Sequence, residues 1–312
     1  MKKVFFTVMA LIVAIASFGQ DEKKEGWTNS GNIGLNFAQS SYTNWAAGGQ
    51  NALNWLGTFN YAINYAKGNF KWDNTLNTAL GYSYFDFHMK PVKTDDKIEF
   101  TSLAGIKATE HLNYSLELAF RSQFAKGYDY AKDSTTYTSK WFAPAYLTLG
   151  LGIEWVPNEH FSINFAPLAG RITFVHDQML AAQGAYGVNE LDKNDTISHG
   201  VDQEVKMIRY EFGARLAAKM KYTLFTNVDF ESKLELFSNY LNHPERIDVD
   251  WQNLFLMKVN SWLNCSIGTH LIYDYDIPFY DLNPDTGKYD LLDPNSKIQF
   301  KEVLSVGLMF KL

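Results

Sequence analysis

The chain has 312 residues and carries 34 acidic against 28 basic side chains, which gives a net charge of −6 at pH 7. This acidic balance argues against a protein that binds nucleic acid. Cys265 is the single cysteine, so an intramolecular disulfide is excluded. Aromatic residues make up 16% of the chain, a high share that is typical of the girdles of membrane barrels.

The N-terminus has the pattern of a secretory signal peptide. A basic start precedes an apolar run from Val4 to Phe18, and small residues follow it. The run is too short to be a stable membrane helix. We therefore expect a cleaved signal peptide over 1–19, a periplasmic tail over 20–30 and a single domain over 31–312.

The domain begins with a predicted strand over 31–38 and continues with two long limbs, 53–65 and 70–84, which meet at a turn around Gly68. In both limbs apolar and aromatic residues share one face, whereas amides, hydroxyls and charges share the other, as the period of a strand requires. Each limb exceeds the roughly 5 or 6 residues of a soluble strand and the roughly 9–11 that cross a bilayer. An aromatic outside with a polar inside is typical of an outer-membrane hairpin.

Further strands with the same alternation follow along the rest of the chain. We expect them over 97–108, 112–125, 145–155, from Phe161 onward, and over 207–220, 222–237, 248–259, 263–273 and 298–312. The strand that begins at Phe161 loses its alternation around Pro167 and Gly170, which indicates a β-bulge. Long and short connections alternate, so both chain ends are expected on the periplasmic side.

These patterns predict an all-β fold, a transmembrane antiparallel up-and-down β-barrel of about 12 strands in the outer membrane. An even count is the rule for single-chain bacterial barrels, and closure leaves no unpaired backbone edge in lipid. The last strand alternates to the C-terminus and resembles the signal read by the outer-membrane insertion machinery. A soluble exported β-sandwich is the competing fold, but the strands are too long and too many for it.

Several runs carry a family resemblance: YTNWAAGG at 42–49, GAYGV at 184–188, and FSNY at 237–240 followed by IDVDW at 247–251. They resemble an uncharacterised family of Bacteroidetes outer-membrane β-barrels, the domain of unknown function 3078. The resemblance implies a barrel in the outer membrane. It implies no activity, because none is established for the family.

Charged residues of both signs occupy the inward positions of the predicted strands and are the candidate lumen residues, together with one histidine. They are Lys71, Asp73, Glu99, Glu117, Arg121, Arg209, Glu211, Arg215, Asp229, Glu231, Lys233, Lys258 and His270. These charges could select a polar solute, or they could pair with one another and fill a narrow lumen, since buried charges need partners. A twelve-strand lumen lies between the filled eight-strand case and the open porins, so the sequence leaves both readings open.

The loop candidates are Trp45, Gly48, Gly49, Asp248 and Asp250. The first three could mark a loop folded into the barrel mouth, or a plain turn. The acidic residues of 274–296 match no calcium-binding loop, and we expect neither a metal nor a cofactor.

The leading functional hypothesis is a channel or transporter for a small solute, with outer-membrane lipid as its surroundings and no nucleic-acid partner. The first alternative is a closed structural or docking barrel that acts through long extracellular loops. A barrel hydrolase is the third hypothesis. It is weakened because Ser266 and His270 lie about 13 Å apart along one strand at about 3.3 Å per residue, too far for a nucleophile and its base.

Overall fold

The structure is a computed structural model that describes residues 25–42, 51–85, 91–129, 133–188, 205–275, 280–282, 289–291 and 297–312. The expected signal peptide (1–19) and the loop candidates Trp45, Gly48 and Gly49 lie outside these residues.

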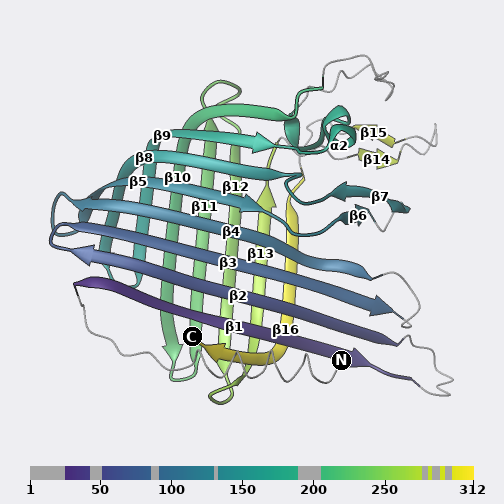
Figure 1. Ribbon diagram of the computed structural model, residues 1–312, viewed down its shortest axis with the longest axis horizontal. Coiled ribbons are helices and arrows are strands. Elements are labelled where there is room, and N and C mark those ends of the chain that lie inside the picture. Colours follow the sequence, from purple (N-terminus) through teal and green to yellow (C-terminus); the bar gives the residue numbers. More distant parts are fainter. Residues whose placement is uncertain are drawn as a thin grey trace.

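Twelve antiparallel strands form one closed barrel (Figure 1). In order around the barrel they are β1 (Gly26–Ser40), β16 (Gln299–Lys311), β13 (Leu263–Tyr273), β12 (Ile247–Lys258), β11 (Val228–Asn239), β10 (Ile208–Phe225), β9 (Phe161–Phe174), β8 (Ala145–Asn158), β5 (Leu112–Ser122), β4 (Val92–Lys107), β3 (Phe70–Phe85) and β2 (Ala52–Lys67). β1 and β16, the first and last strands, pair over Asn32–Asn36 and Gly307–Lys311 and close the ring. The predicted fold class is therefore confirmed.

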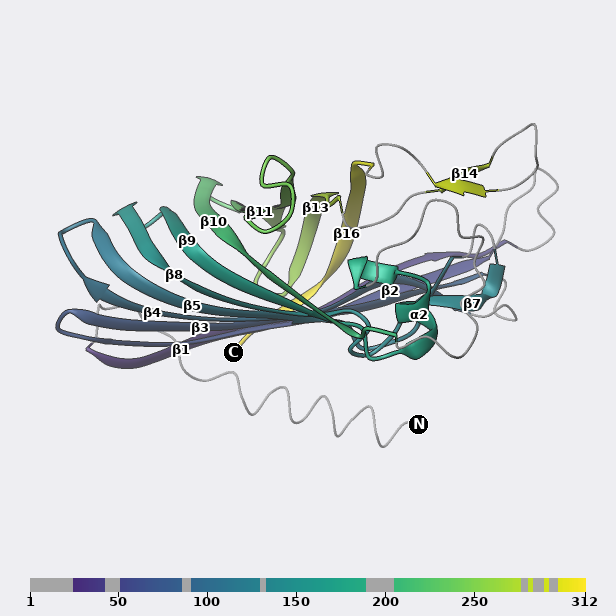
Figure 2. The ribbon, with the colours of Figure 1, turned by 90° about the horizontal axis from the view of Figure 1, so that it is seen from above.

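The remaining described elements belong to the long connections and lie at one end of the barrel, on the right in Figures 1 and 2. They are the hairpin of β6 (Gly127–Asp129) and β7 (Asp133–Ser139), the short helix α2 (Gln178–Ala182), the 3-10 turn η1 (Ala185–Gly187), and the pair β14 (Tyr280–Leu282) and β15 (Tyr289–Leu291). Short turns join the strands at the opposite end. We call the end with α2 the loop end and the other the turn end.

Three predicted boundaries were wrong, because backbone pairing continues where the side-chain pattern gives no signal. β1 begins at Gly26, which pairs with Ala66, so the predicted tail 20–30 overlaps the first strand. β4 begins at Val92 and not at residue 97. The turn expected at residue 221 lies at residues 226–227 instead, since Phe225 still pairs with Val228.

The predicted bulge in β9 is confirmed. Both neighbours of β9 shift register there, because Arg215 of β10 pairs with Ala166 while Gly213 pairs with Ala169. β8 shows the same shift opposite 165–168. Pro167 has no N–H to donate to a ladder, which makes a bulge its natural place in a sheet. The extra residue restores the inward facing of Arg171, which sequence alone left undecided.

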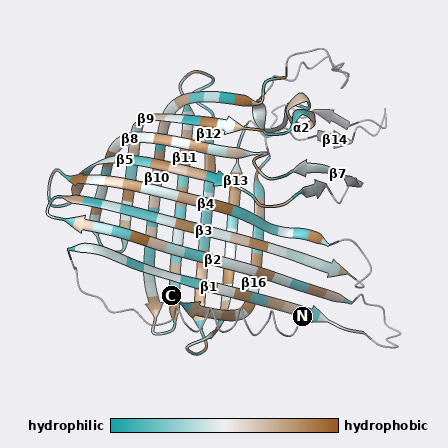
Figure 3. Ribbon diagram, in the orientation of Figure 1, coloured by the Kyte–Doolittle hydropathy of each residue, from teal (hydrophilic) through white to brown (hydrophobic). Residues whose placement is uncertain are grey.

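The outer face of the barrel is apolar and exposed. Tyr114 is 65% exposed, Leu151 55% and Tyr210 69%. In Figure 3 the colours alternate between hydrophobic and hydrophilic along the strands. Two outward tryptophans donate their indole N–H to a serine: Trp72 Nε1 to Ser102 Oγ at 2.8 Å and Trp251 Nε1 to Ser232 Oγ at 3.0 Å. An apolar band with internally satisfied polar groups is what a bilayer requires. No helix among the described residues is long and apolar enough to cross a membrane.

Candidate functional site: the barrel lumen

A network of charges ties opposite walls of the barrel together inside the lumen. Arg121 of β5 forms an ion pair with Asp250 of β12, and β5 and β12 are separated by four strands in one direction and six in the other. Gln252 of β12 contacts β4 twice: its Nε2 donates to Glu99 at 3.3 Å and its Oε1 accepts from Lys97 at 3.2 Å. Five strands separate β4 from β12 on each side, so these contacts span the full width of the lumen.

Between this bridge and the wall of β8, β9 and β10 the lumen is packed. Arg215 forms ion pairs with Glu117 and, at 3.0 Å, with Glu235. Asn164 donates to Glu117 at 2.5 Å and accepts from Ser115 at 2.6 Å. Exposure is 3% for Ser115 and Glu117 and 6% for Asn164 and Arg215. Each buried charge therefore has the partners that offset its loss of hydration.

Arg171 continues the packed region toward the loop end. Its guanidinium donates to Glu211 at 2.8 and 2.7 Å and to Asp248 at 2.6 Å, and it lies 4.0 Å from the ring centre of Phe237. The two donations to Glu211 form a bidentate pair, which fixes the plane of the guanidinium.

Asp248 and Asp250 were wrongly grouped with the loop candidates. Both lie on β12 and point into the lumen, where Asp250 accepts from Arg121, from Gln252 at 3.1 Å and, at 2.9 Å, contacts His270 Nε2. Both have the same parity as Lys258, so the alternation of 248–259 in the sequence already places them on the inward face. Three further lumen residues were not predicted. Asn164 and Gln252 were missed because they are neutral amides, and Arg171 was missed because it follows the bulge.

The other lumen candidates form local pairs at the turn end. Lys71 contacts Glu154 at 2.6 Å and Asp73 at 3.5 Å. Two further contacts of 2.5 Å join Lys258 to Asp229 and Lys221 to Glu231. Lys233 and Arg209 lie in the main network, at 2.9 Å from Glu235 and 3.0 Å from Glu211. The predicted lumen residues thus all face inward, and most are paired with one another.

A cavity of about 400 Å³ opens above the network at the loop end. Tyr146, Tyr186, Phe237 and Tyr273 contribute aromatic surface. About half of the lining residues are charged or titratable, including Arg121, Arg171, Asp250, His270 and Lys301. Lys301 of β16 reaches Asp95 of β4 at 2.8 Å across the mouth. This volume suits a small molecule.

The loop end over β8 and β9 carries a folded cap around Asp177. Asp177 accepts from the Leu180 N–H at the start of α2 at 2.9 Å, from Tyr137 at 2.8 Å and from Lys140 at 2.5 Å. Its burial opposes ionisation, but these donors outweigh it and hold its pKa at about 2. Burial also raises the pKa of Tyr186 in the same cap to about 12. An apolar cluster that includes Val175 and Leu180 packs beneath.

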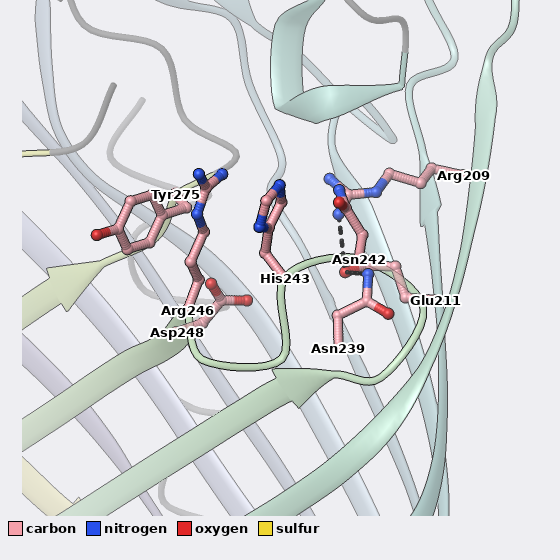
Figure 4. A pocket seen from close by; sticks show the side chains of 8 residues that line it. All are labelled: Arg209, Glu211, Asn239, Asn242, His243, Arg246, Asp248 and Tyr275. Carbon is pink, nitrogen blue, oxygen red and sulfur yellow. Dashed lines mark hydrogen bonds and ion pairs between the residues drawn. The ribbon is translucent and has the colours of Figure 1, made fainter. Parts of the chain in front are cut away.

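A second cavity, of about 30 Å³, lies at the rim where β10, β11 and β12 end (Figure 4). It is lined by Arg209, Glu211, Asn239, Asn242, His243, Arg246, Asp248 and Tyr275. Arg246 stacks over Tyr275 at 4.9 Å. This volume holds about one or two water molecules, so we do not assign a solute to it.

Ser266 and His270, the pair considered for a hydrolase, do not form a nucleophile–base dyad. His270 contacts Asp250, whereas Ser266 Oγ lies 2.8 Å from Ser305 Oγ. The described residues contain no group of histidine, cysteine and acidic side chains that could hold a metal ion.

An apolar outer face around a polar, ion-paired lumen defines the protein as a transmembrane β-barrel. Residues 37–128 match the family described as Protein of unknown function (DUF3078), which confirms the resemblance for that segment. The similar runs at 184–188 and 237–251 lie outside the match. No curated protein matches the sequence.

Three solved structures are similar at low identity. An outer membrane channel from Pseudomonas putida F1 has a TM-score of 0.39 at 9% identity, covering 94% of this chain and 99% of that one. The NanC porin has a TM-score of 0.36 at 9% identity, and the match covers 91% of this chain and 100% of the porin chain. The translocator domain of the autotransporter NalP from Neisseria meningitidis has a TM-score of 0.34 at 10% identity, and the match covers 99% of this chain and 96% of that domain. All three scores are below 0.5, so the fold assignment rests on the strand pairing above.

Proposed function

We propose that this protein is an outer-membrane channel that passes small solutes through a lumen narrowed by the cross-wall ion pairs. The supporting observation is the cavity of about 400 Å³, which opens at the loop end and has the network as its floor. Such a floor limits solute size because Arg121 and Gln252 each reach across to the opposite wall. Cleavage of residues 1–19 and insertion through β16 stay predictions.

Recording from the purified full-length protein in a planar lipid bilayer tests the channel. We expect small, discrete conductance steps. Arg121→Gln and Arg215→Gln should enlarge the steps, since each substitution removes ion pairs that narrow the lumen. A bilayer that stays silent at all voltages for the parent and both variants would end the channel proposal.

The closed structural or docking barrel is the second candidate, and the folded cap around Asp177 favours it. A loop end ordered by an apolar cluster and three donors to one carboxylate presents a fixed outer surface. The same recordings distinguish the two functions, because a docking barrel needs no conductance.

A further inference from the structure

The charges of the lumen are segregated to one side. β4, β5 and β8–β12 carry the network described above, whereas a contiguous group of five strands, β3, β2, β1, β16 and β13, forms a nearly neutral wall that we call the neutral sector. Most of its inward positions hold small or amide side chains: Asn32, Gly34 and Asn36; Asn54, Thr58, Asn60 and Ala62; Thr75, Asn77, Ala79 and Ser83; Ser266 and Gly268; Ser305 and Gly307. Leu56, Ile272, Val303 and Met309 are the larger apolar exceptions. Charged or titratable inward residues of these strands stand at the two ends, such as Asp73 and Lys301.

The neutral sector is packed unevenly. Thr58, Asn60, Thr75 and Asn77 are half-buried, whereas Ala79 and Ser83 of the same sector are 5% and 6% exposed, close to the 3% of Ser115 on β5. Contacts in the sector run sideways to the next strand, as in Asn60 Nδ2 to Asn32 Oδ1 at 2.9 Å. Side chains of this length do not cross the lumen.

Two buried amides point to water at the turn end of the sector. Asn64 Oδ1 on β2 and Asn264 Nδ2 on β13 are buried and have no hydrogen-bond partner among the described residues. Both residues have inward parity, and their strands are separated only by β1 and β16. Buried polar atoms are almost always satisfied, by protein or by ordered water, so these two atoms indicate hydration of the lumen beside them.

We propose that small uncharged, hydroxyl-bearing solutes cross the barrel along the neutral sector, beside the ion-pair network and not through it. This inference rests on the channel function proposed above and assigns its path and solute class. Amides and hydroxyls offer donors and acceptors that replace the water around a hydroxyl. They carry no fixed charge to compensate the desolvation of an ion. The charges across the lumen are already paired with one another.

Cysteine accessibility tests the path. In a Cys265→Ala background, Asn60→Cys and Asn77→Cys place thiols in the neutral sector, Ser115→Cys places one in the packed region, and Thr78→Cys is the lipid-facing control. The probe is an uncharged, sugar-bearing methanethiosulfonate, applied to reconstituted full-length protein during bilayer recording. We expect the two sector thiols to react at least about tenfold faster than the other two, because thiol reactivity follows exposure, and their modification to reduce the conductance.

Solute class is tested by swelling of proteoliposomes in arabinose compared with glutamate and with lysine, which are of similar size. Arabinose should enter about tenfold faster than either ion, a difference that corresponds to about 1.4 kcal/mol.

The outcomes separate the two proposals. A conducting protein that is blocked through Ser115→Cys while Asn60→Cys stays inert would overturn the assigned path and leave the channel standing. Swelling that is as fast in glutamate or lysine as in arabinose would overturn the solute class. A silent protein would end the channel proposal, and the assigned path with it, even if Asn60→Cys reacts.

Discussion

Arg215 should contribute more to stability than any exposed ion pair of this barrel. Its side chain is 7% exposed and touches Glu117, which is 4% exposed, and Glu235. In the variant Arg215→Met, Glu235 still has the ion pair with Lys233 at 2.9 Å. Glu117, by contrast, is left with the side-chain amide of Asn164 as its donor. Removing one partner from a buried pair costs about 3–5 kcal/mol, so we expect a loss in that range.

The assay is urea unfolding of the protein folded in phospholipid vesicles, followed by tryptophan fluorescence. Lys221→Met is the matched control, since Lys221 and Glu231 pair at 2.5 Å but are 70% and 45% exposed. Exposed pairs contribute about 0–1 kcal/mol. Adding Glu117→Gln to Arg215→Met should recover part of the loss, because no buried carboxylate then lacks a cation. Equal losses for Arg215→Met and Lys221→Met would refute the reasoning.

Three further outcomes can be checked. Gly213→Ala should destabilise the barrel by about 1–3 kcal/mol, because the added Cβ would overlap a backbone carbonyl of the neighbouring strand. Gly170→Ala is the control and should be close to neutral, because open space surrounds Gly170. The urea midpoints of the two variants are compared. Ser232→Ala should cost about 1 kcal/mol by removing the acceptor 3.0 Å from Trp251 Nε1, and Ser232→Thr should not. The pKa of Asp177 is lowered from 3.8 to about 2. The contribution of Asp177 to the stability of the cap is therefore complete above about pH 4 and is lost as the pH falls through 2. Hydrogen exchange of the α2 amides, corrected for intrinsic rates, should show this loss, and protection that is unchanged at pH 2 would contradict it.

The strands were predictable because one local rule determines them. Alternation over lengths that exceed a soluble strand indicated the type and number of all twelve and their facing, except for the part of β9 after Pro167, where the loss of alternation marked the bulge. The rule fails where both faces look alike, as at Gly26, or where alternation continues past a plausible turn, as at Lys221. There only the hydrogen-bond partner decides where a strand ends.

The pairing inside the lumen was not predictable from the sequence. Alternation shows that Arg121 and Asp250 both face inward, but they lie 129 residues apart, and nothing local states which acid an inward arginine meets. That choice depends on the order and stagger of the strands around the ring. Neutral members such as Gln252 and Asn164 escape a search for charges, although they complete the contacts that the charges need.

The segregation of charge offers a physical explanation for how a barrel of this size can be both held together and left passable. Eight strands leave a lumen that side chains fill, and sixteen or more leave an aqueous channel. Twelve strands with long charged residues on every wall would close the centre, and short residues on every wall would leave nothing to connect the walls. Here Arg121 and Lys97 reach across the lumen to β12, Arg215 packs the charged side, and asparagine, threonine and serine line the other side. The packed region therefore lies on one side of the ties, and a substitution that lengthens the neutral sector, such as Asn60→Arg, should narrow the path without breaking any ion pair.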